Sequence, residues 1–133
     1  MGELQGRMEQ VAALSAQARA DMFRLYEQYY GGTNEALFSE DLADKQYAVI
    51  LRDEDGRLQG FSSIKVWEET FAGQRFRVMY SGDTIVHQDH WGQQALAFTW
   101  IHFSGALKSD SPDIHLYCLL LVKFHLTYRY LKA

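Results

Sequence analysis

The sequence predicts an α+β domain, in which helices and a mixed β-sheet share one core. Apolar residues first recur at steps of three and four, then alternate or run continuously between turn residues, and then return to helical spacing. The chain has 133 residues, 47% of them hydrophobic, with a single proline, which is typical of a packed globular protein. We therefore expect one cooperative domain spanning residues 1–133.

Two helices are expected before the sheet. Between Val11 and Tyr29 the apolar residues fall on one helical face, at Val11, Leu14, Ala18, Met22, Leu25, Tyr26 and Tyr29. A pair of glycines follows, which suits the left-handed residue that closes a helix. Thr33 or Asn34 then caps a shorter second helix that continues to Asp44.

An antiparallel three-strand meander is expected next. Tyr47–Leu51 is a compact apolar run, Asp53–Gly56 forms a turn, and Leu58–Val66 is rich in β-forming residues. A wider connection leads into Arg75–His87. Consecutive side chains there alternate between two faces, with Tyr80, Thr84 and Val86 on the same face. Gly82 interrupts that alternation, and a glycine inside a strand indicates a bulge or the close approach of a ligand or backbone.

A crossing helix and a following strand complete the expected sheet. Gly92–Lys108 has helical spacing, with an apolar stripe at Ala95, Phe98, Ile101 (or His102) and Gly105. Asp113–Leu121 is interpreted as a buried strand, and an aromatic-rich tail follows it. The most apolar stretch, Ile114–Phe124, is too short to cross a bilayer, so no membrane span is predicted.

Charge and cysteine content narrow the function classes. The chain has 13 Lys and Arg against 17 Asp and Glu, so its formal net charge is −4, and no nucleic-acid surface is indicated. The one cysteine, Cys118, cannot form an intramolecular disulfide and lies in an apolar run, so we expect an inert core thiol. The N-terminal residues lack the pattern of a secretory signal. We therefore expect a reducing, cytoplasmic compartment.

Three stretches of the sequence are similar to segments of one known family. Phe38–Lys45 precedes the hairpin segments Tyr47–Arg52 and Asp55–Ser62, and Ile85–Leu96 reads IVHQDHWGQQAL. Together these stretches resemble the second helix, the hairpin and the strand-to-helix crossing of the general N-acetyltransferase (GNAT) superfamily. The resemblance covers Ala12 to Leu131. It implies a GNAT-like mixed sheet with two N-terminal helices, an antiparallel meander, a crossing helix and a following strand.

The resemblance implies acetyl-CoA as the acyl donor. In this family, backbone N–H groups at a helix N-terminus hold the pyrophosphate of the cofactor. The matching positions in this chain are Trp91, Gly92, Gln93, Gln94 and Ala95, and the pantetheine arm would follow Ile85, Val86 and His87. Gly92 is the one glycine of the family signature that remains. Gln94 and Leu96 stand where the family has small residues, and Leu96 is expected to crowd the pyrophosphate.

Acetyl transfer to an amine needs a base and an acid. Asp83, beside Gly82, and His87, at the end of the strand, are the candidate bases, each acting directly or through a water. Their alternative interpretations are a solvated strand residue and a loop residue. The resemblance places the acid among tyrosines after the fifth strand, which are Tyr128 and Tyr130; the alternative is packing tyrosines.

No metal site is predicted. His87, Asp89 and His90 are ligand types, but they are neighbours along one loop, and no helical His pair or distant third ligand joins them. The expected partner is a small-molecule or peptide amine of unknown identity.

Two functions from different classes remain open. The first is an acyl-CoA-dependent N-acyltransferase. The second is a catalytically inactive GNAT-like binding or dimerisation module, favoured by the lost glycines and by an end at Ala133, before the last two strands of the family. A sheet edge left unpaired there would favour a homodimer. A third interpretation, an unrelated α+β small-ligand protein, would need a strand order that is inconsistent with the meander.

Overall fold

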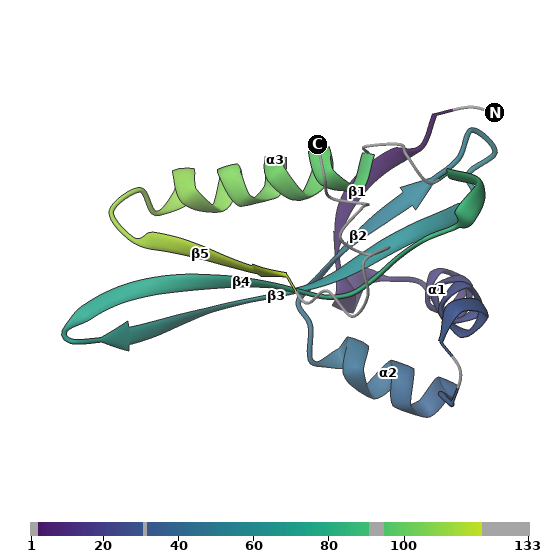
Figure 1. The fold of residues 1–133 in the computed structure, drawn as a ribbon, viewed down its shortest axis with the longest axis horizontal. Coiled ribbons are helices and arrows are strands. Elements are labelled where there is room, and N and C mark those ends of the chain that lie inside the picture. Colours follow the sequence, from purple (N-terminus) through teal and green to yellow (C-terminus); the bar gives the residue numbers. More distant parts are fainter. Residues whose placement is uncertain (1–2, 31, 91–94, 121–133) are drawn as a thin grey trace.

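Five strands form one mixed sheet in a computed structural model, which describes residues 3–30, 32–90 and 95–120. The strands follow one another across the sheet in chain order (Figure 1). They are β1 (Gln5–Gln10), β2 (Tyr47–Arg52), β3 (Leu58–Phe71), β4 (Gln74–Val86) and β5 (His115–Leu120). The pairs β1–β2, β2–β3 and β3–β4 are antiparallel, and the pair β4–β5 is parallel. The predicted meander is confirmed as β2–β3–β4.

The strand β1 is absent from the sequence-based prediction. It pairs with β2 from Gln5–Arg52 to Gln10–Tyr47, at the edge of the sheet. Its residues are mostly polar, and because an edge strand has one long side in solvent, it shows little apolar alternation. The chain then forms one 3-10 turn, Val11–Ala13, where the sequence predicted the start of a helix.

Two helices follow as predicted, with a shorter first one. α1 (Ala16–Tyr29) begins after Ser15, whose hydroxyl oxygen accepts a hydrogen bond from the backbone N–H of Ala18 at 3.0 Å. α2 (Glu35–Ala43) begins after Asn34, whose side-chain oxygen accepts from the N–H of Leu37 at 2.9 Å. Each cap satisfies a backbone donor that has no partner inside its helix.

The sheet separates two apolar clusters. α1 and α2 cover one face, and α3 (Ala95–Asp110) covers the other (Figure 1). The cluster under α1 and α2 contains Val11, Leu14, Ala18, Met22, Leu25, Phe38, Leu42, Ala48, Ile50, Phe61 and Ile85. The cluster under α3 contains Leu4, Val49, Leu51, Ile64, Met79, Val86 and Leu96. Alternate residues of β2 enter opposite clusters, as expected for a strand buried on both faces.

The helix α3 buries a different face from the one that the sequence indicated. Phe98 and Ile101 of the predicted stripe are 65% and 58% exposed. Leu96 and Ala97 are buried instead, and Trp100, Phe103 and Leu107 pack against the cluster under α3. Apolar residues occur all around α3, so periodicity fits more than one stripe, and the sheet decides which stripe is covered.

The β3–β4 hairpin is longer than predicted. The sequence indicated a connection over Glu68–Gln74, but β3 continues to Phe71 and β4 begins at Gln74. Ala72 and Gly73 alone form the turn, with φ angles of 53° and 79°. Two residues with positive φ give the tight turn that matches strand twist. The resulting ribbon extends beyond β1 and β2, with β5 and α3 beside it (Figure 1).

Candidate active site

A β-bulge interrupts β4 at Gly82 and Asp83. Ser62 of β3 pairs with Thr84, and Ile64 pairs with Ser81. Two steps along β3 therefore correspond to three steps along β4, so that Gly82 and Asp83 together stand opposite one residue of β3. This extra residue is the irregularity that Gly82 predicted, and it is confirmed. A bulge of this kind changes the direction of backbone groups and is frequent beside active sites.

The bulge also changes which side chains of β4 lie on each face of the sheet. Met79 and Val86 both belong to the cluster under α3, and Ile85 belongs to the cluster under α1 and α2. The sequence had grouped Tyr80 with Thr84 and Val86 by strict alternation. Because of the extra residue, even-numbered side chains after Ser81 lie on the face that odd-numbered side chains occupy before it. The predicted grouping is therefore wrong for the second half of the strand.

Three buried hydroxyl groups form a chain of hydrogen bonds at the bulge. Ser62, Ser81 and Thr84 are at most 3% exposed. Thr84 Oγ1 donates to the carbonyl oxygen of Gly82 at 3.1 Å. Because a threonine hydroxyl carries one proton, Ser62 Oγ donates to Thr84 Oγ1 at 2.9 Å, and Ser81 Oγ donates to Ser62 Oγ at 2.6 Å.

This hydroxyl chain holds the backbone of the bulge. Each donor in it is used once, and the last proton points at the Gly82 carbonyl. Successive hydrogen bonds in a buried chain strengthen one another because each polarises the next. The orientation of the peptide unit between Gly82 and Asp83 is therefore coupled to Ser62 on the neighbouring strand.

The pairing between β4 and β5, as far as the structure describes it, ends just before the bulge. It runs from Phe76–His115 to Ser81–Leu120. Beyond that point, Thr84 and Ile85 remain paired with β3 on one edge. Leu120 is the last residue of β5 that the structure describes.

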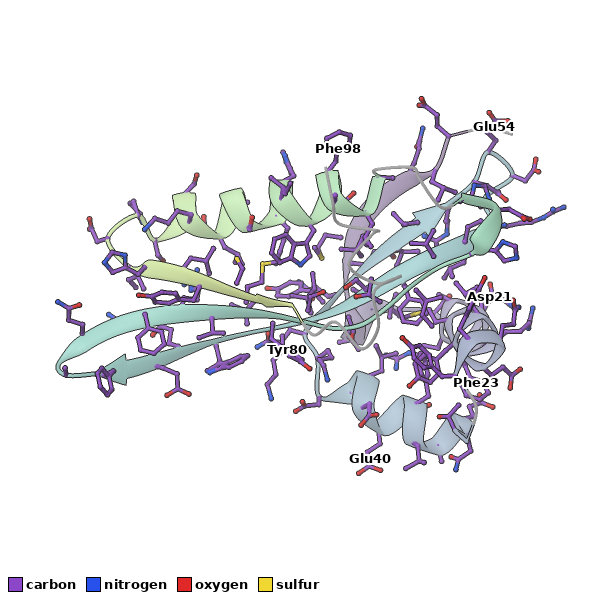
Figure 2. All side chains as sticks on the ribbon, viewed as in Figure 1. Asp21, Phe23, Glu40, Glu54, Tyr80 and Phe98 are labelled. Atoms are coloured by element: carbon purple, nitrogen blue, oxygen red, sulfur yellow. The ribbon has the colours of Figure 1, made fainter. Side chains whose placement is uncertain are left out.

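Lys45 and Tyr80 pack on the α2 side of the bulge, where Figure 2 labels Tyr80 on β4. A methyl group placed on Gly82 would lie 3.2 Å from Lys45 Cε, 3.4 Å from Tyr80 Cε2 and 3.0 Å from Ser63 Oγ. A side chain at position 82 would therefore have to displace these neighbouring side chains by a few tenths of an ångström. The Lys45 side chain is only 14% exposed, and its Nζ donates to the carbonyl of Asp41 at 3.3 Å.

The structure separates the two candidate bases. Asp83 is part of the bulge itself. His87 follows β4, and its backbone N–H donates to the carbonyl of Gln59 at 2.7 Å. A strand rises about 3.3 Å per residue, so His87 lies on the order of 16 Å from Gly82 along the chain. Of the two candidate bases, Asp83 is therefore the one that belongs to the bulge.

The His87 side chain is held at the opposite end of the strand. Its Nδ1 accepts a hydrogen bond from the backbone N–H of Asp89 at 3.2 Å. It also lines a cavity of about 330 Å³ together with Asp21, Arg24 and Gln28 of α1. This position is compatible with the cofactor-side assignment of His87 and places its imidazole away from the bulge.

The cofactor-side residues are only partly described. The side chains of Ile85 and Val86 are buried in opposite clusters, and Ala95 is the first residue of α3. Trp91, Gly92, Gln93 and Gln94 lie outside the described residues, as do Tyr128 and Tyr130. Leu96 is 1% exposed within the cluster under α3. The expectation that its side chain crowds the cofactor is therefore wrong, because it points into the core.

The remaining sequence candidates give no other site. Within residues 3–30, 32–90 and 95–120, no three His, Cys, Asp or Glu side chains gather to hold a metal ion. Cys118 is exposed on β5 and not in the core as expected. Partial burial of its sulfur still raises the pKa of the thiol, which disfavours the reactive thiolate. None of the helices in the described part is both long and apolar enough to span a membrane.

Comparison with known proteins identifies the fold. The sequence matches no protein-family model and no curated protein. A GNAT family N-acetyltransferase from Escherichia coli, solved in complex with CoA, matches the structure with a TM-score of 0.64 at 14% identity, over 98% of this chain and 68% of that one. The chain has a GNAT-like fold. The same fold is found in glucosamine-6-phosphate N-acetyltransferase from Arabidopsis thaliana, with a TM-score of 0.64, 13% identity and coverage of 96% and 87%.

A third match has the same GNAT-like fold with an amine ligand. It is an aminoglycoside acetyltransferase from an uncultured soil metagenomic sample in complex with sisomicin, with a TM-score of 0.59 at 14% identity, covering 98% of this chain and 88% of that one. The third interpretation needed a strand order that is inconsistent with the meander, and the described sheet instead contains the predicted meander.

Proposed function

We propose that the chain is an acyl-CoA-dependent N-acyltransferase that transfers an acetyl group to an amine. The observation that carries this proposal is the bulge at Gly82 and Asp83 in β4, held by a chain of buried hydroxyls. Backbone groups that are fixed before a ligand arrives stabilise developing charge without reorganising. A GNAT-like fold places such a bulge in a scaffold that other acetyltransferases use.

The described residues fit acetyl-CoA as the donor. The pantetheine arm would run along the backbone of Ile85, Val86 and His87, at the end of β4. The Leu96 side chain is buried in the cluster under α3, so it does not occupy the place of the pyrophosphate. Trp91, Gly92, Gln93 and Gln94 complete the proposed pyrophosphate contact through their N–H groups. Acetyl-CoA supplies the activated acetyl group.

The chain's own side chains supply proton transfer. Asp83, as part of the bulge, accepts the proton of the attacking amine directly or through one water. Tyr128 or Tyr130 donates a proton to the departing thiolate. His87 contributes at the cofactor end and not at the reacting amine, because it lies about five strand residues beyond Gly82. The acceptor is a small-molecule or peptide amine.

Thermal unfolding with and without millimolar acetyl-CoA tests the proposal. Binding to the folded chain raises the midpoint, by about 2.7 kcal/mol of stabilisation when the ligand is at ~100 times its dissociation constant. Gly82→Val should lose this shift, because the new side chain meets Ser63 and Lys45. Gly105→Ala is the matched control and should keep the shift, since a methyl group at Gly105 has no neighbour within 4 Å.

An amine screen then tests transfer itself. Release of the CoA thiol is followed with a thiol reagent over a panel of aminoglycosides, amino sugars and peptides. Asp83→Asn should keep the acetyl-CoA shift and lose turnover. A cooperatively folded chain that shows no shift would support the alternative, a catalytically inactive GNAT-like binding or dimerisation module.

A further inference from the structure

Lys45 is the described lysine whose side chain reaches the bulge. Its Cε lies 3.2 Å from the position of a methyl group on Gly82, and the stem is largely buried. Lys65 and Lys108 direct their amines elsewhere. Lys65 Nζ donates to both carboxylate oxygens of Asp44 at 3.0 and 3.2 Å, and Lys108 Nζ donates to the carbonyls of Pro112 and Ile114.

The Lys45 amine is one bond beyond the Cε that lies beside Gly82, and it makes weak contacts with the end of α2. It has one long hydrogen bond to the Asp41 carbonyl, at 3.3 Å, and lies 3.7 Å from the carboxylate of Asp44. That carboxylate is bound mainly by Lys65, whose hydrogen bond holds the pKa of Asp44 below its ordinary value. Little energy therefore ties the Lys45 nitrogen to one position, while its stem stays packed beside Gly82.

We propose that Lys45 is a site of self-acylation, at which the chain transfers an acetyl group from acetyl-CoA to its own amine. This inference rests on the proposed function, because the acetyl group must lie against the bulge. The amine nitrogen would then be the nearest described amine to the thioester carbon and would approach it from the α2 side of the sheet. A reactant held in place by the fold reacts faster than one in free solution.

The transfer of the acetyl group to Lys45 needs acetyl-CoA and no other co-reactant. The neutral Lys45 amine attacks the thioester carbonyl, so a carbon–nitrogen bond forms and the carbon–sulfur bond breaks. The electron pair of the broken bond leaves with sulfur, which takes up a proton as the CoA thiol. The attacking nitrogen gives up the proton that the sulfur takes, so the lysine ends as an uncharged acetamide. Where Lys45 starts as an ammonium, it loses one proton to solvent before it attacks. No oxidant or reductant is consumed.

The Lys45 side chain borders open space, and its acylation should change how the chain reacts with external amines. Lys45 also lines a cavity of about 580 Å³ with Arg19, Gln46 and Tyr47. Acylation removes the charge of Lys45 and adds an apolar group beside Gly82 and Tyr80, where an external amine would approach the bulge. An acylated chain should therefore transfer acetyl groups to external amines more slowly than an unmodified one.

Mass spectrometry of the purified chain tests the inference. The chain is incubated with acetyl-CoA carrying an isotopically labelled acetyl group, and labelled peptides are mapped over time. Lys45 should be acetylated about tenfold or more faster than Lys65, because Lys45, unlike Lys65, has its stem packed beside Gly82. Lys45→Arg keeps the charge and most of the stem and should lose this fast labelling. Lys65→Arg is the matched control and should retain it.

The outcomes separate this inference from the proposed function. Stabilisation by acetyl-CoA without preferential labelling of Lys45 overturns self-acylation and leaves the acyltransferase proposal standing. Equal labelling of Lys45, Lys65 and Lys108, unchanged when the chain is unfolded in urea, indicates uncatalysed chemistry and also overturns it. Neither stabilisation nor labelling in a cooperatively folded chain overturns both proposals. The melting temperature of Lys45→Arg, measured alongside, confirms that the variant is folded.

Discussion

The part of β4 before the bulge at Gly82 and the part around the bulge differ in what they bury on the face under α3. Met79 contributes a fully buried apolar group to the cluster under α3, but Ser81 and Thr84, on the same face, contribute hydroxyls bound to one another through Ser62.

This difference assigns separate roles to the two halves of one strand. The first half is stabilised by packing and by backbone pairing on both edges, so its side chains mainly set the stability of the domain. Around the bulge, Ser81 and Thr84 bury hydroxyl groups instead, which stabilise the fold less than apolar groups do but fix the direction of backbone groups. Substitutions in the two halves should therefore give different patterns of stability and binding.

The largest effect is expected from Met79→Ala, in the first half. Removing this fully buried side chain leaves a cavity under α3 and should cost about 2–5 kcal/mol of unfolding free energy. Urea denaturation measures the loss, and any remaining folded chain should still be stabilised by acetyl-CoA. Phe71→Ala is the control from the exposed tip of the same ribbon and should change stability by less than about 0.5 kcal/mol. Equal losses in the two variants would contradict the packing role of Met79.

An intermediate effect is expected from Ser62→Ala, beside the second half. The substitution leaves Ser81 without its acceptor and Thr84 without its donor, and should cost about 1–3 kcal/mol of unfolding free energy. It should also speed amide hydrogen exchange at Asp83 and Thr84, because the Gly82 carbonyl is no longer held by a continuous chain.

The control for this variant is Ser104→Ala, whose hydroxyl donates to the carbonyl of Ile101 within α3. Ser104→Ala should leave exchange at the bulge unchanged. If Ser62→Ala lowers stability but leaves exchange and acetyl-CoA binding at wild-type values, the hydroxyls serve packing alone, and the two halves of β4 do not differ in the way described.

The smallest effect is expected from Glu68→Gln, on the ribbon of the first half. Arg75 donates to the carboxylate at 2.8 and 3.1 Å, and this contact holds the pKa of Glu68 below its ordinary value. The ion pair thus stabilises the folded chain above about pH 4.3, the ordinary glutamate pKa, and loses its effect as pH falls through the lowered pKa.

Melting temperatures at pH 7 and pH 3 measure this contribution. Wild type should exceed Glu68→Gln slightly at pH 7, and the difference should shrink at pH 3 and in high salt, since the pair is exposed to solvent. A difference that grows on acidification would show that the carboxylate does not act through Arg75.

Local patterns were sufficient for several features of the fold. The buried face of α1, with Ala18, Met22 and Leu25, was predicted because helical periodicity is a property of neighbouring residues. The bulge was predicted at Gly82 for the same reason, since a glycine inside a strand already marks an irregularity. The resemblance to the GNAT superfamily was confirmed at the level of the fold.

Features that depend on partners across the fold were missed. The edge strand β1 has too few apolar residues to show its period, and α3 has apolar residues on more sides than one. The hydroxyl chain gave only a weak signal, the serine pair Ser62 and Ser63 within an otherwise apolar strand. Lys45 gave none, because its contact with Gly82 joins residues that are distant in the sequence.

The sequence by itself determined the order of two helices, a meander, a crossing helix and a last strand, the buried face of α1, and the interruption of β4 at Gly82. These are local properties of the chain, set by side-chain period and backbone preference. Only the tertiary structure decided that the bulge carries a chain of buried hydroxyls towards α3 and a lysine on the α2 side. Such neighbours are set by how sheet and helices pack, because packing brings together side chains that no sequence spacing relates.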